Sequence, residues 1–177
     1  MRQTKGRWQC IGFIFTGVLG TFFHFLFDLT GGSIGAALIS AVNESIWEHM
    51  KLLFYPMVLF AFIEYGRWGK DLPHFWCIKL RGILLGLILI PVLYYSYTGI
   101  LGVSADWFNI AIFFITAGVV YRWETQQLLS DAKKPCKSLV ALGMLGLMAV
   151  AFTMLTFFPP RIPLFQDPVT GTYGFQK

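Results

Sequence analysis

Residues 138–158 read SLVALGMLGLMAVAFTMLTFF and contain no charged side chain. A continuous apolar stretch of about 20 residues is long enough to cross the hydrocarbon core of a bilayer as an α-helix. A membrane-spanning β-strand would instead alternate apolar and polar residues. This segment therefore predicts a transmembrane helix.

Four more segments of similar length and composition occur upstream, at about 9–29, 44–65, 79–98 and 107–123. All five together predict an all-α fold, an integral membrane helical bundle of about five transmembrane helices. We expect one domain over residues 1–177, with an outer C-terminal tail at 159–177. A short apolar segment at 33–42 precedes the second span, and it is left open whether this segment enters the membrane as a re-entrant loop.

The overall composition agrees with this class. Hydrophobic residues make up 56% of the chain and charged residues 13%, about half of the ~25% that is usual in soluble domains. A soluble domain of this size lacks the interior volume to bury so much apolar surface. The composition therefore excludes a soluble globular enzyme and a disordered chain. The lipid bilayer is the expected partner, and we expect no nucleic acid despite the net charge of +5.

The basic residues are distributed unevenly along the predicted spans. Of the 14 Lys and Arg residues, 11 lie in the N-terminal tail, in the two loops on the same side of the membrane, or at the span ends next to these loops. The other three are Lys51, Arg161 and Lys177. Cytoplasmic loops carry an excess of Lys and Arg. This pattern predicts a cytoplasmic N-terminus and an outer C-terminus.

The three cysteines, Cys10, Cys77 and Cys136, fall at the predicted cytoplasmic edge. The cytosol keeps thiols reduced. We therefore expect all three cysteines to be reduced.

Ionisable residues concentrate at the outer ends of the first two spans. His24 and Asp28 are four residues apart and share one helix face, as do Glu44 and Glu48, with His49 next to them. The glycine-containing loop between the spans is short enough to hold the two helix ends together. We predict that these five side chains converge in a polar pocket at the outer face. Further residues are expected to support the pocket: Asn43, Lys51, Tyr55, Asp106 and Asp167.

Ionisable side chains inside a membrane are costly and are candidates for function. Imidazole and carboxylate ligands suit a divalent transition metal such as zinc. Three readings stay open: a cation or small-ligand site in a transport, sensing or accessory protein; a metal-dependent hydrolase at the outer leaflet; and a structural or partner subunit without a ligand. The residues do not decide whether the protein is an enzyme, and they assign no catalytic residue.

Parts of this pocket also have a purely structural reading. Asn43 is typical of a helix N-cap, and Glu48 with Lys51 is typical of an ion pair three residues apart. At the inner edge, snorkelling or paired side chains are expected at Glu64, Arg67, Arg122 and Glu124.

Small residues recur at four-residue spacing within the spans. The first span has Gly12, Thr16 and Gly20, and the third has Gly82 and Gly86. Small residues let helices approach closely in lipid. The spacing fits contacts within the bundle, and a homo-oligomer also stays open.

Three short motifs resemble those of a known family: His24-Phe-x-x-Asp28, Asn43-Glu-Ser-Ile-Trp-Glu-His49 and the C-terminal Asp167-Pro-x-Thr-Gly171. The chain resembles a family of small bacterial polytopic membrane proteins of unknown function. The resemblance implies a bacterial cytoplasmic membrane and implies no particular activity.

Overall fold

A computed structural model describes residues 2–130 and 137–176. These residues form six α-helices and two short 3-10 helices, and no β-strand occurs among them. The elements are α1 (Arg2–Leu29), α2 (Ile34–Ala37), α3 (Ile46–Arg67), η1 (Gly69–Asp71), α4 (Phe75–Leu101), α5 (Asp106–Leu129), α6 (Ser138–Phe157) and η2 (Pro163–Phe165). The predicted all-α fold is confirmed.

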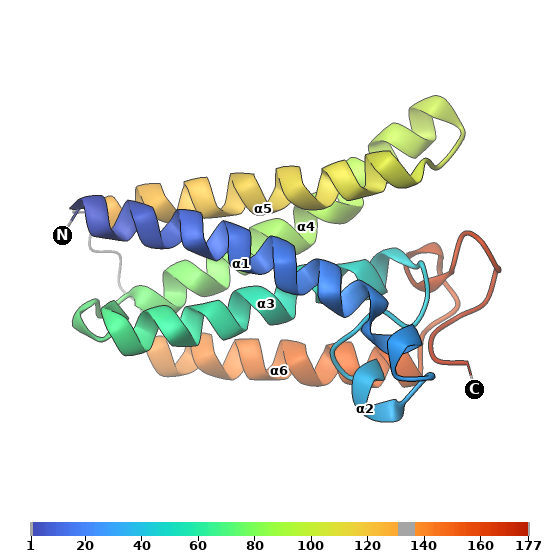
Figure 1. Cartoon of the computed structure of the whole chain (residues 1–177), viewed down its shortest axis with the longest axis horizontal. Helices are drawn as coiled ribbons and strands as arrows, with labels where there is room; N and C mark the ends of the chain where they lie inside the picture. The colour runs from blue at the N-terminus through green and yellow to red at the C-terminus, as the bar shows by residue number, and fades with distance from the viewer. Residues whose placement is uncertain (1, 131–136, 177) are drawn as a thin grey trace.

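Four helices are long and apolar enough to cross a membrane: Lys5–Leu29 within α1, and the whole of α3, α4 and α6. α5, which contains the predicted span 107–123, is not among these four. Its apolar middle is flanked by polar side chains near both ends, including Asp106 and Glu124. α5 nevertheless runs alongside α1 and α4 (Figure 1), and its crossing of the membrane stays a prediction.

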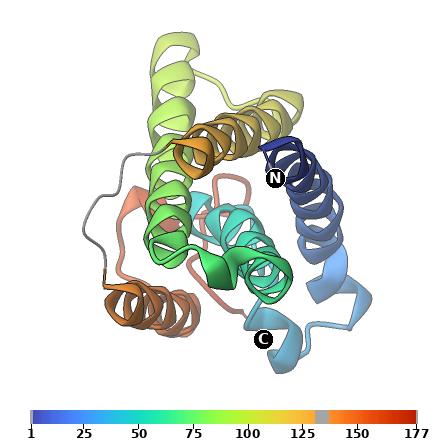
Figure 2. The same cartoon turned by 90° about the vertical axis from the view of Figure 1, so that its left-hand side faces the viewer.

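α3 lies at the centre of the bundle, with α1, α5, α4 and α6 around it (Figure 2). It is the most buried of the candidate spans, because 61% of its apolar window lies inside the protein. A buried helix exposes few of its side chains on any face. Three charged residues of α3, Glu48, Lys51 and Glu64, accordingly lie in the interior, where each is at most 1% exposed.

Glycines allow close contact between the helices. A Cβ added at Gly12 would lie 2.5 Å from the ring of Phe60, and one added at Gly20 would lie 2.7 Å from the backbone oxygen of Leu52. Both of these glycines pack α1 against α3. The predicted small-residue spacing in the first span therefore serves contacts within the chain.

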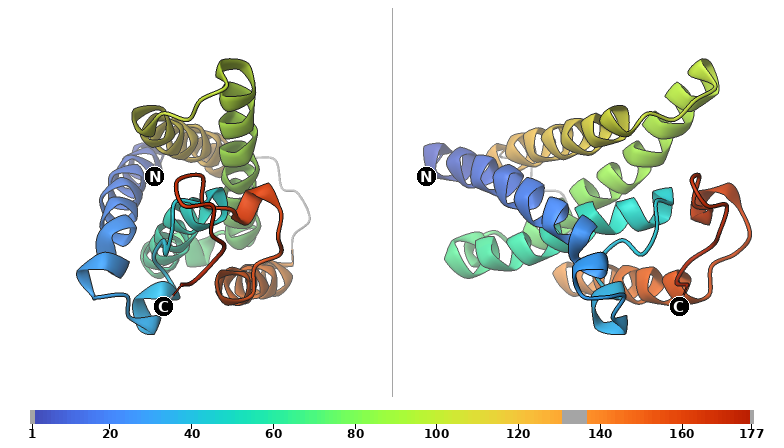
Figure 3. Two further views of the ribbon diagram at one scale, coloured as in Figure 1. Left: turned by 90° about the vertical axis from the view of Figure 1, so that its right-hand side faces the viewer. Right: turned by 45° about the vertical axis from the view of Figure 1, so that its right-hand side comes forward.

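The C-terminal segment folds back over the end of the bundle where α1 ends and α3 begins, which we call the tail end (Figure 3). The backbone N–H of Phe175 donates to the carbonyl of Thr156 at 2.8 Å. The ring of Phe165, at 5% exposure, stacks on Trp47 with centroids 4.8 Å apart. The segment is therefore a packed part of the fold.

The cysteines differ from the expectation. Cys10 is a free thiol, whereas Cys77 is disulfide-bonded, and Cys136 lies outside the described residues. The expectation of a reduced Cys77 is therefore wrong for this structure. It was based on the redox state of the compartment, and sequence spacing alone does not show which thiols meet in space.

Candidate metal site

Three of the five predicted pocket residues come together at the tail end: His24 from α1, Glu44 from the loop before α3 and His49 from the first turns of α3. One ligand atom of each lies within 4.8 Å of the other two. The Nε2 atoms of His49 and His24 lie 3.4 Å and 3.9 Å from the Glu44 carboxylate. We call these residues the His–Glu–His cluster.

The loop between α1 and α3 brings Glu44 back to the end of α1. The chain reverses direction at Gly31 and Gly32, whose φ angles are 64° and 76°. Glycine adopts this left-handed region without the steric cost of a Cβ. α2 follows after Ser33, whose side chain caps it. A compact connection thus joins the two spans and holds their ends together, as expected from its short length and its glycines.

The ring of His49 is held in a defined orientation. Its Nδ1 lies 2.9 Å from the backbone carbonyl of Ser45. A carbonyl oxygen can only accept, so Nδ1 holds a hydrogen, and Nε2 is the ring nitrogen that faces Glu44. Metal-binding histidines are commonly oriented in this way by a backbone carbonyl at the second nitrogen.

The cluster is open on one side. The side chains of His24 and His49 are 30% and 28% exposed, and that of Glu44 is 48% exposed. Asp28 is exposed and interacts electrostatically with His24, but it is not one of the three residues whose ligand atoms meet. An ion from the surface could therefore reach the cluster.

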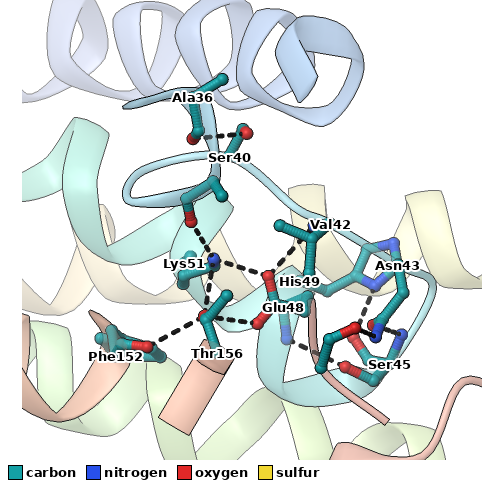
Figure 4. A network of polar contacts seen from close by, with 12 residues as sticks. Ala36, Ser40, Val42, Asn43, Ser45, Glu48, His49, Lys51, Phe152 and Thr156 are labelled. Carbon is teal, nitrogen blue, oxygen red and sulfur yellow. Dashed lines mark hydrogen bonds and ion pairs between the residues drawn. The ribbon is translucent and has the colours of Figure 1, made fainter. Parts of the chain in front are cut away.

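Glu48, the remaining predicted ligand, lies in a separate buried network (Figure 4). Its carboxylate pairs with the ammonium of Lys51 at 2.6 Å, and it accepts from the hydroxyl of Thr156 at 2.7 Å and from the backbone N–H of Val42 at 3.1 Å. Lys51 also donates to the carbonyl of Ala37 at 3.0 Å. Glu48 and Lys51 thus form the ion pair of the structural reading.

Asn43 links the loop of the cluster to the C-terminal segment. Its Nδ2 donates to the carbonyl of Gly174 at 3.1 Å, and its Oδ1 accepts from the backbone N–H of Ser45 at 3.0 Å. The N-cap of α3 is Ser45, whose side chain accepts from the N–H of Glu48. The N-cap reading of Asn43 is therefore wrong, because α3 begins two residues later than that reading requires.

The other supporting residues lie elsewhere. Tyr55 donates to the carbonyl of Ala149 in α6 at 3.4 Å. Asp106 is exposed at the start of α5. Asp167 is buried within the C-terminal segment, where its side chain accepts from the N–H of Val169 at 2.7 Å. Within the described part of the chain, none of these three forms a hydrogen bond or ion pair with the His–Glu–His cluster.

A second buried polar group lies at the opposite end of the bundle. The ammonium of Lys79 in α4 contacts the carboxylates of Glu64 in α3 and Glu124 in α5, the latter at 2.5 Å. The side-chain amide of Gln9 in α1 donates to Glu64 at 2.6 Å. We call these four residues the Lys79 cluster, and each is at most 2% exposed.

Glu64 and Glu124 were expected to be snorkelling or paired side chains at the inner edge, and the structure shows both buried and paired with Lys79. The involvement of Lys79 and Gln9 was not predicted. Lys79 was counted with the loop charges that set the orientation. α4 begins at Phe75, so Lys79 lies a full turn inside the helix. A lysine followed by the small residue Gly82 within an apolar helix was the available signal.

A protein-family model described as a family of unknown function, DUF6512, matches residues 1–175. The chain belongs to this family. This membership agrees with the family resemblance that the sequence motifs indicated. Because the function of the family is unknown, membership assigns no activity to this chain. Searches of curated proteins and of solved structures find no significant match. A function for this DUF6512 protein therefore depends on the geometry of its own polar clusters.

Proposed function

We propose that this protein is a multi-pass membrane protein that binds a divalent transition metal ion, such as zinc, at the His–Glu–His cluster. The observation that supports this most directly is the meeting of three suitable ligand atoms within 4.8 Å. Metal–ligand bonds of about 2.0–2.1 Å at tetrahedral angles place neighbouring ligand atoms about 3.3 Å apart. Small side-chain rotations would bring the observed separations of 3.4 Å and 3.9 Å to this value.

The distances also favour a metal over a simple hydrogen-bonded network. Hydrogen bonds from ring nitrogens to carboxylate oxygens are about 2.7–3.2 Å long. Both contacts of Glu44 with the histidines exceed this range. An ion between the three side chains would provide a partner for all of them once the small rotations described above have occurred.

A sensing or accessory role fits the packing better than transport by this chain alone. Transport along α1 would need a polar path from the cluster toward the N-terminal end. α1 and α3 instead touch closely at Gly12 and Gly20. The Lys and Arg distribution predicts that the cluster lies at the outer face of the membrane, and the family resemblance implies that this membrane is a bacterial cytoplasmic membrane.

A metal-dependent hydrolase at the outer leaflet is a second candidate, supported by one observation. Two histidines and one glutamate with an exposed side match the ligand set of several zinc hydrolases, in which the fourth position holds a water molecule. Release of fatty acid from phospholipid vesicles by the zinc-loaded protein, absent in His49→Ala, would favour this candidate. Zinc binding without such release would favour a sensing or accessory role.

Zinc binding to the purified protein in detergent tests the proposal. After removal of metal with a chelator, calorimetric titration with Zn²⁺ should show binding that weakens roughly tenfold or more in His24→Ala and His49→Ala, because even loss of an outer-shell partner costs about 10–100-fold. The chain has one further histidine, His74, at the N-cap of α4. His74→Ala is the matched control and should bind zinc like the parent. Equal zinc affinity in the parent and in a folded His24→Ala, His49→Ala double variant would contradict the site.

A further inference from the structure

The Lys79 cluster has an excess of negative charge. One ammonium faces two carboxylates, and all three groups are buried. The ring of Tyr121 lies 5.8 Å from the Lys79 ammonium, and its hydroxyl shares a hydrogen bond of 2.8 Å with Thr16. With the Lys79 ammonium and the carboxylates of Glu64 and Glu124 ionised, the cluster has a formal charge of −1.

The neighbouring described elements do not supply the missing positive charge. α6, which packs against α4, has no ionisable side chain. Lys5 of α1 donates to the carbonyl of Leu128 and lies over the ring of Trp68. The remaining described ionisable side chains at this end are exposed, except for the half-buried Tyr65 and His74. The exposed ones are Arg7, Cys10, Arg67, Lys70, Asp71, Arg81, Arg122 and Lys137.

The cluster also lacks hydrogen-bond donors. Gln9 Oε1 and Glu124 Oε1 are buried and have no hydrogen-bond partner among the described residues. The amide of Gln9 is directed into the cluster, because its nitrogen donates to Glu64. The cluster thus combines two acceptor oxygens that lack a donor with an excess of one negative charge. A proton on one carboxylate would remove the charge and create an O–H donor.

The available space favours a proton over a larger cation. A Cβ added at Gly82 would collide with Glu124 Oε1, so this oxygen lies directly against the backbone of α4. The ammonium of Lys79 already lies between the two carboxylates. A metal ion would need several oxygen ligands at about 2.0–2.6 Å, whereas a proton needs only one lone pair.

We propose that the Lys79 cluster is a proton-binding site, which holds one proton between Glu64 and Glu124 at neutral pH. A buried charge without compensation costs several kcal/mol, so proton uptake is the favourable outcome. The cluster joins α1, α3, α4 and α5, and loss of the proton leaves a net negative charge at their contact. This site is separate from the proposed metal site and needs no metal.

The sign of the pH dependence follows from linkage. The folded protein holds a proton that a solvated glutamate would have released at neutral pH. The folded state therefore binds more protons than the unfolded state, and stability falls as the pH rises through the titration of the cluster. The melting temperature of the parent in detergent should decrease across that range.

Infrared spectroscopy of the full-length protein at pH 7, without added metal, provides the direct test. The parent should show the C=O stretch of a protonated carboxylic acid. Glu124→Gln and Glu64→Gln should each abolish this band, because either variant leaves one carboxylate for one ammonium. Lys79→Met should retain or strengthen the band, because it leaves two carboxylates without a cation. The exposed Asp106 gives a matched control, and Asp106→Asn should leave the band unchanged.

Two spectroscopic results would overturn the proposal. One is a parent spectrum with ionised carboxylates only. The other is a protonated-carboxyl band that persists in both Glu124→Gln and Glu64→Gln. The pH dependence gives a second readout, since the melting temperature of Glu124→Gln should vary less with pH than that of the parent. An equal dependence in both proteins would likewise contradict the site.

Discussion

At the scale of single residues, the buried pair of Glu48 and Lys51 shows how polar groups are accommodated in an apolar bundle. Lys51 has no exposed surface and Glu48 is 1% exposed. Their partners come from the loop before α3 and from Thr156 in α6. Buried polar groups are tolerated when they are hydrogen-bonded. The pair therefore connects α3 to two other parts of the chain.

Removal of one partner should be far more harmful than removal of both. Lys51→Met leaves the Glu48 carboxylate buried without its cation, which we expect to lower the free energy of unfolding by about 3–5 kcal/mol. The Glu48→Leu, Lys51→Met double variant should recover much of this loss. Denaturant unfolding in detergent measures both. A double variant that is no more stable than the Lys51→Met protein would show that the ion pair does not account for the loss.

At the scale of helices, the close approach of α1 to its neighbours depends on positions without a side chain. Gly20 faces the backbone of Leu52 and the ring of Phe113, each 2.7 Å from an added Cβ. In α6, by contrast, nothing lies within 4 Å of a Cβ added at Gly146. Two glycines in apolar helices are thus predicted to respond in opposite ways to the same substitution.

Gly20→Ala should lower the free energy of unfolding by about 1–3 kcal/mol, the usual cost of overpacking. Gly146→Ala should be neutral or stabilising by up to about 1 kcal/mol, since alanine is the better helix former. Thermal unfolding of the two variants in one detergent makes the comparison. Similar melting temperatures for both would contradict the α1–α3 contact at Gly20.

At the scale of the whole molecule, the termini lie at opposite ends of the bundle (Figure 1). Five long helices that alternate in direction would produce this arrangement with five crossings. The distribution of Lys and Arg predicts that the end with the N-terminus faces the cytoplasm. The same end contains the disulfide-bonded Cys77, although thiols are kept reduced in the cytosol.

Fusions to alkaline phosphatase, which is active only outside the cytoplasm, test this orientation. A fusion at the C-terminus should be active, and one in the connection between α3 and α4 should be inactive. Trapping of thiols during lysis gives an independent measurement. A Cys77 disulfide in the trapped protein, or an inactive C-terminal fusion at normal expression, would place the N-terminal end outside.

The helical spacing and the glycine-containing loop predicted that His24, Asp28, Glu44, Glu48 and His49 converge. Of these, His24, Glu44 and His49 meet, but the grouping of Glu44 with Glu48 on one helix face does not hold. Residues four apart share a face only within one helix. α3 begins at Ile46, so Glu44 lies in the loop and is free to turn toward the histidines. Glu48 lies inside the helix and faces Lys51. The exact start of a helix is among the features that sequence patterns define least well.

The sequence by itself determined the all-α class and the approximate limits of the helices. The physical reason is that span length and apolar composition are set along the chain by the thickness of the bilayer. Only the tertiary structure decided which polar groups meet. Gln9, Glu64, Lys79 and Glu124 come from four helices, and their contact depends on which helix faces pack together. No spacing along one segment encodes that relation.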